Sequence, residues 1–359
     1  MIKNTKKHFC FILPSLFGGG MERVMVEIAH NFIRNKNAEV TFILLSRNKR
    51  FYDLDPAIQV IEPPVKYNKN YKILFTLKTL LFTREAIKKI NPDIVLSFGE
   101  KWNSFNILLL LFTKYKLFVS DRSSPKLKLS IMHKILRGIL YRKTIGIIAQ
   151  TSHANAKIFS VTNHKNIITI GNPIRNFGQN ENIVRENIIV NVGRFETTKQ
   201  QIQLIEIFAG IKTENWKLVL IGNGRCLEAA KNKVKLLGIE NKVDFTGEVK
   251  NVDDYYKKSK IFAFTSILEG FPNALAEALA TPLACISYDC SAGPADLITD
   301  NNNGYLIEEN NISEFRYKLE LLMNDEQLRT QFEQNAMLKI KEFSSEDICD
   351  KYYSFLTSK

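Results

Sequence analysis

The feature that most constrains the fold is a rhythm of short apolar runs separated by helical patterns, and the chain carries this rhythm twice. Such runs are typical of strands buried on both faces of a parallel sheet, and the helical patterns between them supply the crossovers. The first series lies at residues 8–13, 39–45, 93–98, 116–120, 145–150 and 167–170, and the second at residues 187–192, 217–221, 242–245, 260–265, 283–288 and 305–307.

The sequence Gly171-Asn172-Pro173, which favours a turn, separates the two series. A chain of 359 residues is also long for one α/β core and fits two. We therefore predict an α/β protein with two Rossmann-like, doubly wound parallel-sheet domains, at residues 1–172 and 173–340, that face each other across a cleft. The final helical stretch, about residues 341–359, is expected to pack back on the first domain. Ligands of such sheets bind beyond the carboxyl ends of the strands.

Composition favours a globular protein, with 45% hydrophobic and 24% charged residues. The five cysteines form no Cys-x-x-Cys pair, which indicates a reducing compartment and no structural metal. The longest apolar stretch, residues 107–112, is too short to cross a bilayer. Pro14 interrupts the apolar run near the N-terminus, so we interpret this run as a first strand and not as a secretory signal. The prediction is a cytoplasmic protein, soluble or peripheral.

The net charge of +13 is spread unevenly. Residues 1–172 carry 28 Lys and Arg against 10 Asp and Glu, whereas residues 173–359 carry 22 against 27, and no acidic residue occurs from Arg122 to Asn180. A basic half of this kind attracts phosphate groups. Within it, residues 125–143 combine an apolar stripe, expected to be core in part, with basic residues. We predict that the basic face binds an anionic membrane surface or the diphosphate of an acceptor.

A glycine loop, Gly18-Gly19-Gly20, follows the first predicted strand and leads into a helix that starts near Met21. Glycines let backbone amides approach an anion, and a helix N-terminus favours negative charge. The same loop can equally be a tight strand-to-helix turn. It lacks the lysine of a P-loop and the Gly-x-Gly-x-x-Gly spacing of dinucleotide-binding folds, so the sequence argues against both classes.

Charged residues follow two predicted strands of the second series. Arg194 comes directly after one strand and Lys199 five positions later, and together they can bind a diphosphate, although a solvated loop is the simpler explanation of either alone. Glu269 precedes an Ala/Leu-rich helix that holds Glu277. An unpaired carboxylate buried in such a helix costs several kcal/mol, so Glu277 is expected to accept hydrogen bonds from hydroxyl groups such as those of a ribose. Pro272 is predicted as the first residue of that helix.

These motifs together resemble glycosyltransferase family 4, whose members have the GT-B fold. The resemblance rests on the glycine loop, on Gly193-Arg194 with Lys199, on Gly222-Asn223-Gly224, and on Glu269-Gly270-Phe271-Pro272-Asn273 with Glu277. The Glu-x7-Glu spacing is its most specific element. The segments at residues 120–125 and 289–298 are similar to bacterial hexose and N-acetylhexosamine transferases of surface-polysaccharide and lipid-linked-oligosaccharide assembly. Nearly the whole chain is covered.

The resemblance implies roles for the residues that match. Arg194, Lys199 and Glu269 would be catalytic, with Glu269 on the sugar, and Glu277 would bind the ribose. The donor diphosphate would be bound by Gly19, Gly20, Arg194, Lys199, Phe271, Pro272, Asn273 and Ala274. The base would lie against Gly222, Asn223, Gly224, Val249 and Lys250.

The resemblance also implies an activity. A retaining enzyme would move a hexose or N-acetylhexosamine from a UDP-sugar to a glycan acceptor, expected to be linked to polyprenyl diphosphate at the inner face of the plasma membrane. Because two cations would neutralise the diphosphate, neither a metal nor another cofactor is expected. The pair Asp53 and Asp55 is interpreted as a solvated turn and not as a metal site.

One departure from the family concerns a histidine that many members place in the first-domain cleft. No residue here matches it, and Asn103, Asp121 and Arg122 are the local candidates for the acceptor side. Two alternatives on the same scaffold are a nucleotide-sugar epimerase or phosphorylase and a protein that binds a nucleotide sugar without turnover. A nucleic-acid binder would explain the basic half, but no reading motif or stacking platform is present, so nucleic acid is not expected.

Overall fold

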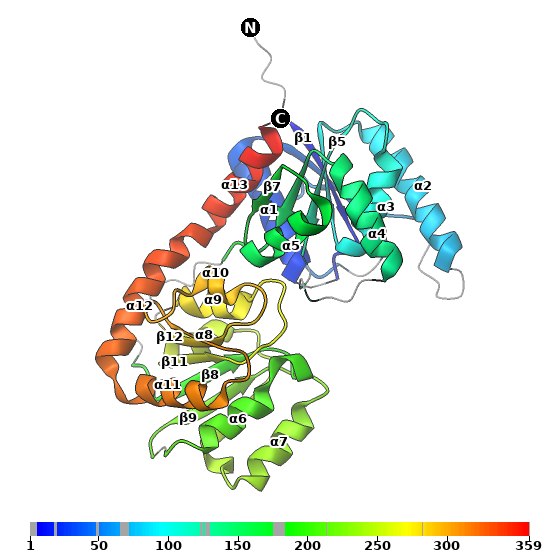
Figure 1. The fold of residues 1–359 in the computed structure, drawn as a ribbon. Helices are drawn as coiled ribbons and strands as arrows, with labels where there is room; N and C mark the ends of the chain where they lie inside the picture. Colours follow the sequence, from blue (N-terminus) through cyan, green and yellow to red (C-terminus); the bar gives the residue numbers. More distant parts are fainter. Residues whose placement is uncertain are drawn as a thin grey trace. The chain divides into compact units, whose positions relative to one another are not determined.

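A computed structural model of the protein describes residues 6–17, 20–47, 50–64, 72–122, 124, 126, 130–174, 184–212, 214–281 and 283–358. The chain forms two compact units. Unit 1 comprises Met1–Pro173 and Ser345–Lys359, and unit 2 comprises Ile174–Ser344. Each unit has its own parallel sheet with helices packed around it, as Figure 1 shows. The α/β fold with two doubly wound sheets is thereby confirmed.

Unit 1 contains a seven-stranded sheet in the order β3-β2-β1-β4-β5-β6-β7. All its pairs are parallel, and β1 and β2 align from His8 opposite Glu39 to Leu13 opposite Leu44. The strands are β1 (His8–Leu13), β2 (Glu39–Leu44), β3 (Gln59–Ile61), β4 (Ile94–Phe98), β5 (Lys116–Asp121), β6 (Gly146–Ala149) and β7 (Ile167–Thr169). The helices are α1 (Gly20–Lys36), α2 (Lys72–Ile90), α3 (Glu100–Leu110), α4 (Ile131–Leu140), η2 (Tyr141–Lys143), α5 (Ser152–Thr162) and α13 (Ser345–Thr357).

Unit 2 contains a six-stranded parallel sheet in the order β10-β9-β8-β11-β12-β13. Two clusters of buried apolar side chains pack against this sheet. The strands are β8 (Ile188–Val192), β9 (Lys217–Ile221), β10 (Val243–Gly247), β11 (Ile261–Phe264), β12 (Ala284–Tyr288) and β13 (Tyr305–Ile307). The helices are η3 (Thr197–Lys199), α6 (Gln201–Ala209), α7 (Leu227–Leu236), η4 (Glu240–Lys242), α8 (Val252–Lys258), α9 (Asn273–Leu279), α10 (Pro294–Leu297), α11 (Ile312–Asn324), α12 (Glu326–Ile340) and η5 (Lys341–Phe343).

Each predicted strand is present, with ends that agree to within two residues. The structure adds β3, a three-residue edge strand whose Gln59 is exposed. An edge strand this short carries no continuous apolar run, so the pattern that reveals the other strands does not reveal this one.

The units divide one residue later than expected at the first boundary and four residues later at the second. The second difference arises because η5 stays with unit 2. The Ile174 amide donates to the Phe343 carbonyl at 3.0 Å, and Ile174 forms a parallel bridge with Ser344. The chain therefore returns to unit 1 at Ser345.

Helix α13 packs on unit 1 beside α1. It buries Ile348, Cys349, Tyr352 and Leu356. The ring of Tyr353 lies 5.3 Å from that of Phe32, measured between centroids. An ion pair between Lys36 and Asp350, 2.7 Å long, joins the same two helices. The last helix of the chain thus completes the core of the unit formed by the first residues.

Candidate active site

The order of strands in unit 2 places the predicted site at its topological switch point. Strands β8 and β11 are neighbours, while the chain runs outward from β8 toward β10 and from β11 toward β13. The loops that leave the carboxyl ends of two such strands diverge, and the crevice between them is where open α/β sheets bind ligands. The loop after β8 (residues 193–200, the β8 loop) carries Arg194 and Lys199. The loop after β11 (residues 265–272, the β11 loop) carries Glu269.

Backbone contacts between loops position the β8 loop. Its Phe195 amide donates to the carbonyl of Asn223, on the loop after β9, at 2.8 Å. Gly222 on that neighbouring loop has φ of +136°, and a Cβ there would lie 2.1 Å from the Gly193 oxygen. Only glycine permits this approach, because a side chain would overlap the facing carbonyl. The two glycines let the backbones of both loops meet.

Lys199 and Glu269 form an ion pair between the two loops, although 70 residues separate them. Their side chains are 22% and 11% exposed, so the pair is shielded in part yet accessible. The Ile267 amide donates to Thr198 at 2.9 Å, and the Thr265 hydroxyl donates to the Lys199 carbonyl at 3.0 Å. These bonds hold the end of the β8 loop against the start of the β11 loop, and the Lys199 ammonium lies 5.8 Å from the centroid of the Phe264 ring.

Arg194 is exposed, and among the described residues its guanidinium makes no hydrogen bond or ion pair. Its backbone oxygen accepts from the Gln201 side chain at 3.1 Å, which orders the start of the loop. By contrast, Arg225 on the neighbouring loop pairs with Glu196 at 2.5 Å. Arg194 therefore offers donors to a ligand at no cost in broken protein contacts.

The segment that begins α9 differs in detail from the prediction. The helix starts at Asn273 and Pro272 is its N-cap residue, one position earlier than a first helical residue. The Asn273 amide donates to the Phe271 carbonyl at 3.0 Å, so it is already engaged in this state. Phe271 and Pro272 are buried, and Ala274 is half-buried. Their predicted role in diphosphate binding stays a prediction.

Glu277 is half-buried, although its apolar helix led us to expect full burial. The residues of α9 that face the core are Leu275, Ala276, Ala278 and Leu279, which leaves Glu277 at the rim of the packed face. The Tyr256 hydroxyl has a pKa well above its usual range, first because it is buried and second because the Glu277 carboxylate lies nearby. Glu277 therefore keeps part of its side chain at the surface of the unit, and its role in ribose binding stays a prediction.

The predicted base-binding residues lie on the loops after β9 and β10. The Gly222 amide donates to the Gly247 carbonyl at 2.8 Å, and the Gly224 amide donates to the Asn223 side chain at 2.8 Å. Val249 packs partly against the core, and Lys250 is exposed. The loop after β9 borders the β8 loop, and base binding by these residues stays a prediction.

The first-domain candidates form a polar network inside unit 1. Asn103 is fully buried and donates to Asp121 at 3.1 Å, and the Tyr141 hydroxyl donates to Asp121 at 2.7 Å. Arg137 of α4 forms an ion pair with Asp121. Burial raises the pKa of Asp121 to about 6, although the Arg137 guanidinium acts to lower it.

Arg122 belongs to the same interior and is 8% exposed. Its guanidinium donates to the Tyr352 hydroxyl of α13 at 2.7 Å and to the Asn172 side chain at 2.5 Å. The sequence did not reveal Tyr352 and Asn172 as partners of Arg122, because both residues are distant from Arg122 in the chain. This placement gives Asn103, Asp121 and Arg122 a structural role, and acceptor binding by them stays a prediction.

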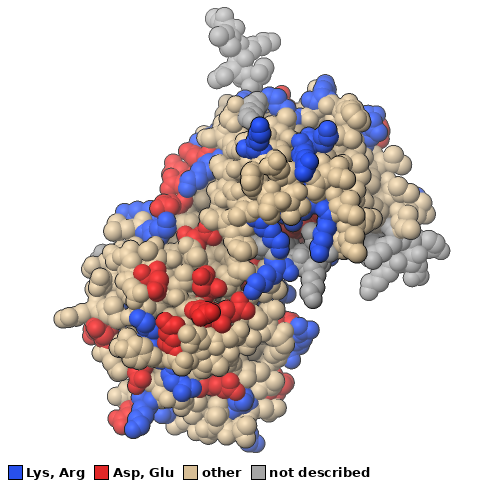
Figure 2. Space-filling view, in the orientation of Figure 1, with Lys and Arg blue, Asp and Glu red and all other residues tan. Residues whose placement is uncertain are grey.

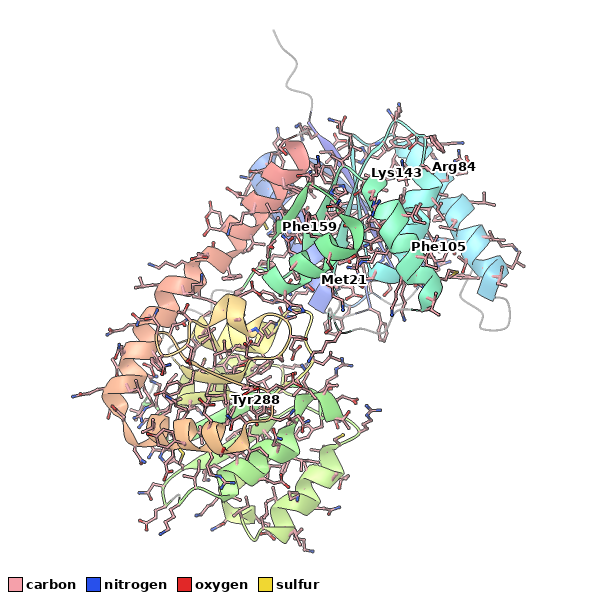
Figure 3. The ribbon with its side chains drawn as sticks, viewed as in Figure 1. Met21, Arg84, Phe105, Lys143, Phe159 and Tyr288 are labelled. Atoms are coloured by element: carbon pink, nitrogen blue, oxygen red, sulfur yellow. The ribbon has the colours of Figure 1, made fainter. Side chains whose placement is uncertain are left out.

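Of the predicted glycine loop, Gly18 and Gly19 lie outside the described residues. Gly20 is the first residue of α1, and Met21, labelled in Figure 3, follows it in the first turn. The helix begins where the sequence predicts. A role of Gly19 and Gly20 toward donor phosphates stays a prediction.

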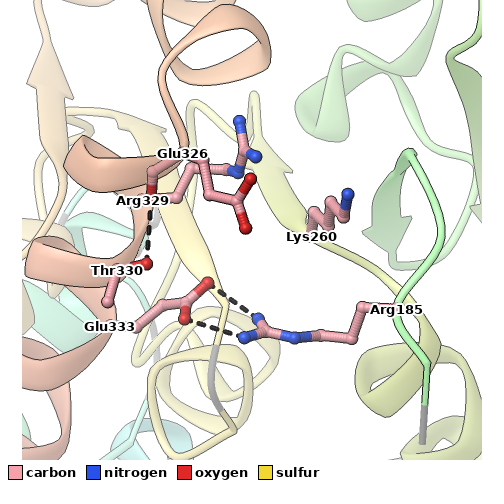
Figure 4. Close-up of a pocket in the computed structure, with 6 residues that line it drawn as sticks. All are labelled: Arg185, Lys260, Glu326, Arg329, Thr330 and Glu333. Atoms are coloured by element: carbon pink, nitrogen blue, oxygen red, sulfur yellow. Dashed lines mark hydrogen bonds and ion pairs between the residues drawn. The ribbon is translucent and has the colours of Figure 1, made fainter.

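A polar hollow of about 270 Å³ lies near the amino ends of the unit 2 strands (Figure 4). Its lining residues are Arg185, Lys260, Glu326, Arg329, Thr330 and Glu333. Arg185 and Lys260 precede β8 and β11, so they belong to the amino ends of the strands. Arg185 donates to both oxygens of Glu333, at 2.7 and 3.0 Å, and Lys260 donates to Asn187 at 2.8 Å. These cations are already paired, so the hollow is not the predicted donor site.

Within the described ranges, no group of three or more His, Cys, Asp or Glu residues is arranged to hold a metal ion. Asp55 of the predicted solvated turn accepts from the Ala57 amide at 3.1 Å and pairs with Arg34. Among the residues that are described, no helix has the length and apolar character needed to span a bilayer.

Comparison with known proteins gives these placements a context. Residues 174–339 match the family described as glycosyl transferases group 1. The whole chain is similar to an α-1,4-N-acetyl-D-galactosaminyltransferase of Campylobacter jejuni, whose name specifies an undecaprenol-diphosphate-linked acceptor. The identity is 28% over 356 residues, which covers 96% of this chain and 97% of the relative.

Solved structures with the same fold cover both units. The lipopolysaccharide outer core galactosyltransferase WaaB, in its apo form, has a TM-score of 0.81 at 23% identity, over 98% of this chain and 99% of that one. HepE from Anabaena, solved in complex with UDP, has a TM-score of 0.81 at 15% identity, over 98% of this chain and 100% of that one.

Proposed function

We propose that this chain moves a hexose or N-acetylhexosamine from a UDP-sugar to a glycan acceptor. Its residues 174–339 match the glycosyl transferases group 1, and its fold and its similarity to a bacterial N-acetylgalactosaminyltransferase support this proposal. We propose further that the transfer retains the anomeric configuration and needs no metal. The acceptor in this proposal is linked to polyprenyl diphosphate, which agrees with the acceptor in the name of the Campylobacter relative.

The observation that carries the proposal is the set of charges at the unit 2 switch point. Arg194 is exposed and without a partner among the described residues, and Lys199 is paired with Glu269 across the crevice. When a nucleotide sugar binds there, the Lys199 ammonium can turn from the carboxylate to the diphosphate, and Glu269 can then accept hydrogen bonds from sugar hydroxyls. The unliganded ion pair keeps both charges compensated until the ligand replaces it.

The proposed chemistry requires stabilisation of the negative charge that develops on the leaving diphosphate. Arg194 offers a planar fork of donors and Lys199 a compact charge, and both are held by backbone bonds before the substrate arrives. The diphosphate oxygen can assist the acceptor hydroxyl on the face from which it departs, which gives retention. The protein thus contributes mainly charge stabilisation and positioning.

Two further parts of the site complete the donor assignment. Glu277 at the rim of α9 is proposed to bind the ribose hydroxyls. The loops that hold Gly222–Gly224 and Val249–Lys250 are proposed to flank the uracil. The solved complex of HepE with UDP supports a UDP donor for this fold. We place the protein at the inner face of the plasma membrane, where the proposed acceptor would be reached.

The first test compares transfer by the wild-type enzyme with transfer by Arg194→Ala and Lys199→Ala variants. A thermal-shift screen of nucleotide sugars first identifies the donor, and product formation with a lipid-linked acceptor is then measured. Each variant should lose about 10²-fold or more in turnover, the scale of removing one preorganised donor from a developing anion.

Lys217→Ala, an exposed cation at the amino end of β9, serves as the matched control and should keep wild-type turnover. Full activity in both site variants would refute the site. A complete, manganese-rescued loss of activity in chelator would refute metal independence. Conversion of the donor without any acceptor would instead favour an epimerase, and donor binding without transfer to any acceptor would favour a binding protein.

A further inference from the structure

Unit 1 exposes far more large apolar side chains than unit 2. Among the described residues, 14 of the 19 exposed large hydrophobic side chains belong to unit 1, and eight of them lie on α2 and α4. Isolated exposed apolar residues are ordinary, but a contiguous set marks a surface that something covers. The apolar stripe at residues 125–143, which we expected to be core in part, is therefore mostly outside the core.

Helix α4 presents this stripe along one side. Ile131, Ile135 and Ile139 recur every four residues and are 77%, 56% and 58% exposed, and Met132 is 53% exposed. Leu140 on the other side is buried. Lys134, which flanks the stripe, is exposed. A surface helix of a globular protein usually turns its apolar side to the core, whereas α4 turns much of its apolar side to solvent.

Helix α2 repeats the arrangement. Ile73, Leu77 and Leu81 recur every four residues and are 79%, 54% and 63% exposed, and Leu74 beside them is 49% exposed. The opposite side of this helix is buried through Phe75, Thr79 and Ala86. Exposed basic residues alternate with the stripe and follow it, namely Lys78, Arg84, Lys88 and Lys89.

The two helices are held in one part of unit 1 because both pack against α3. Phe105 of α3 contacts His133 of α4, with ring centroids 5.9 Å apart. Figure 1 shows α2, α3 and α4 as neighbours, and Figure 3 labels Arg84 on α2 and Phe105 on α3. Arg137 further anchors α4 to β5 through its ion pair with Asp121. Both helices are therefore anchored in the same part of unit 1.

Charge identifies the occupant of this surface. Figure 2 shows basic side chains spread among large uncharged areas on the face of unit 1 that it draws. Exposed isoleucine and leucine at helical spacing next to lysine and arginine match the boundary between acyl chains and anionic head groups. A second protein copy with the same basic surface would be repelled.

We propose that α2 and α4 form a lipid-docking surface, in which the two exposed apolar stripes enter the headgroup and acyl boundary of an anionic bilayer while the neighbouring lysines and arginines bind lipid phosphates. This inference deepens the proposed function, because it names the surface that would bring unit 1 to a membrane-linked acceptor. It differs from purely electrostatic attraction in that part of the affinity comes from apolar contact and does not depend on salt.

The test measures sedimentation of the full-length protein with phosphatidylglycerol–phosphatidylcholine vesicles at low and high salt. The wild-type protein should bind at low salt and keep measurable binding at high salt. A triple variant, Ile131→Ser, Ile135→Ser and Ile139→Ser, should bind about 10-fold more weakly or worse at both salt concentrations. Leu236→Ser with Leu338→Ser, which are 79% and 65% exposed on unit 2, form the control and should bind like the wild type.

Three outcomes would overturn the inference. They are no binding of the wild-type protein to anionic vesicles, unchanged binding of the triple variant, and self-association of the wild-type protein without lipid that the triple variant abolishes. The thermal shift produced by UDP is measured on every variant in parallel. A wild-type protein that binds vesicles but not UDP would contradict the proposed donor and leave the lipid surface standing, and the reverse result would contradict only the lipid surface.

Discussion

At the scale of single residues, the candidate site depends on glycines as much as on charges. Gly222 and Gly224 lie against the backbone of the β8 loop, and a Cβ on Gly224 would come within 2.4 Å of the Phe195 oxygen. Arg194 and Lys199 owe their positions to these contacts. The charged residues supply the proposed chemistry, and the glycines determine where that chemistry takes place.

The Gly222→Ala variant tests this role. The added methyl would meet the Gly193 carbonyl at 2.1 Å and would also strain a backbone with φ of +136°, so the loss of stability should clearly exceed the ~1 kcal/mol of an unfavourable φ alone. Gly238→Ala is the matched control, because Gly238 also has positive φ but nothing lies within 4 Å of its Cβ position. Urea denaturation of both variants gives the comparison. Equal losses would show that the contact with Gly193 is unimportant.

At the scale of elements, α13 joins the end of the chain to its beginning. Its Tyr352 is fully buried, hydroxyl and ring together, and the hydroxyl accepts a hydrogen bond from Arg122 in the polar network at the end of β5. The helix therefore supports both the apolar core of unit 1 and the buried guanidinium at the end of β5. Loss of the contacts of α13 should therefore lower the stability of unit 1.

The Tyr352→Ala variant should destabilise unit 1 by about 3–5 kcal/mol, the range for truncating a large buried aromatic side chain. It also leaves the Arg122 guanidinium without one of its partners. Hydrogen exchange followed by mass spectrometry should show faster exchange in β1 and β5 and unchanged exchange in β8 and β11. Ser354→Ala, exposed on the same helix, is the control. Uniform acceleration in both units would contradict the assignment of α13 to unit 1.

At the scale of the whole molecule, the chain is two units with separate cores. A core cluster of unit 1 contains β1, β4, β5 and β6 side chains, and the described clusters of unit 2 contain side chains of its own strands and helices. A ligand stabilises the unit that binds it by mass action, about 2.7 kcal/mol at 100 times its dissociation constant. The two units should therefore respond differently to a nucleotide.

We expect UDP to slow hydrogen exchange in unit 2, most strongly in the β8 and β11 loops, and to change exchange in the core strands of unit 1 much less. The Arg194→Ala variant should need a higher UDP concentration for the same protection. Calorimetry should show the unit 2 transition moving to higher temperature with UDP. Protection confined to unit 1 would contradict the placement of the donor site.

Much of this protein follows from its sequence. The doubled rhythm of apolar runs predicts the strands and both sheets, because strands buried on two faces must be apolar at nearly every position. The glutamate spacing and the loop charges predict a glycosyltransferase, which agrees with the family match at residues 174–339 and with the similarity to the Campylobacter relative. Residue types and local spacing are sufficient to predict the strands and the charged loops, because each loop directly follows its own strand in the sequence.

Only the tertiary structure decides which side chains meet and which stay exposed. The ion pair of Lys199 and Glu269 exists because β8 and β11, distant in the chain, are neighbours in the sheet. Asp121 and Arg122 are polar residues at the end of a strand, yet partners from α4 and α13 enclose them. The stripe on α4 has the spacing of a core helix, but no described element covers it. Periodicity states which residues share a face, and long-range packing determines what that face touches.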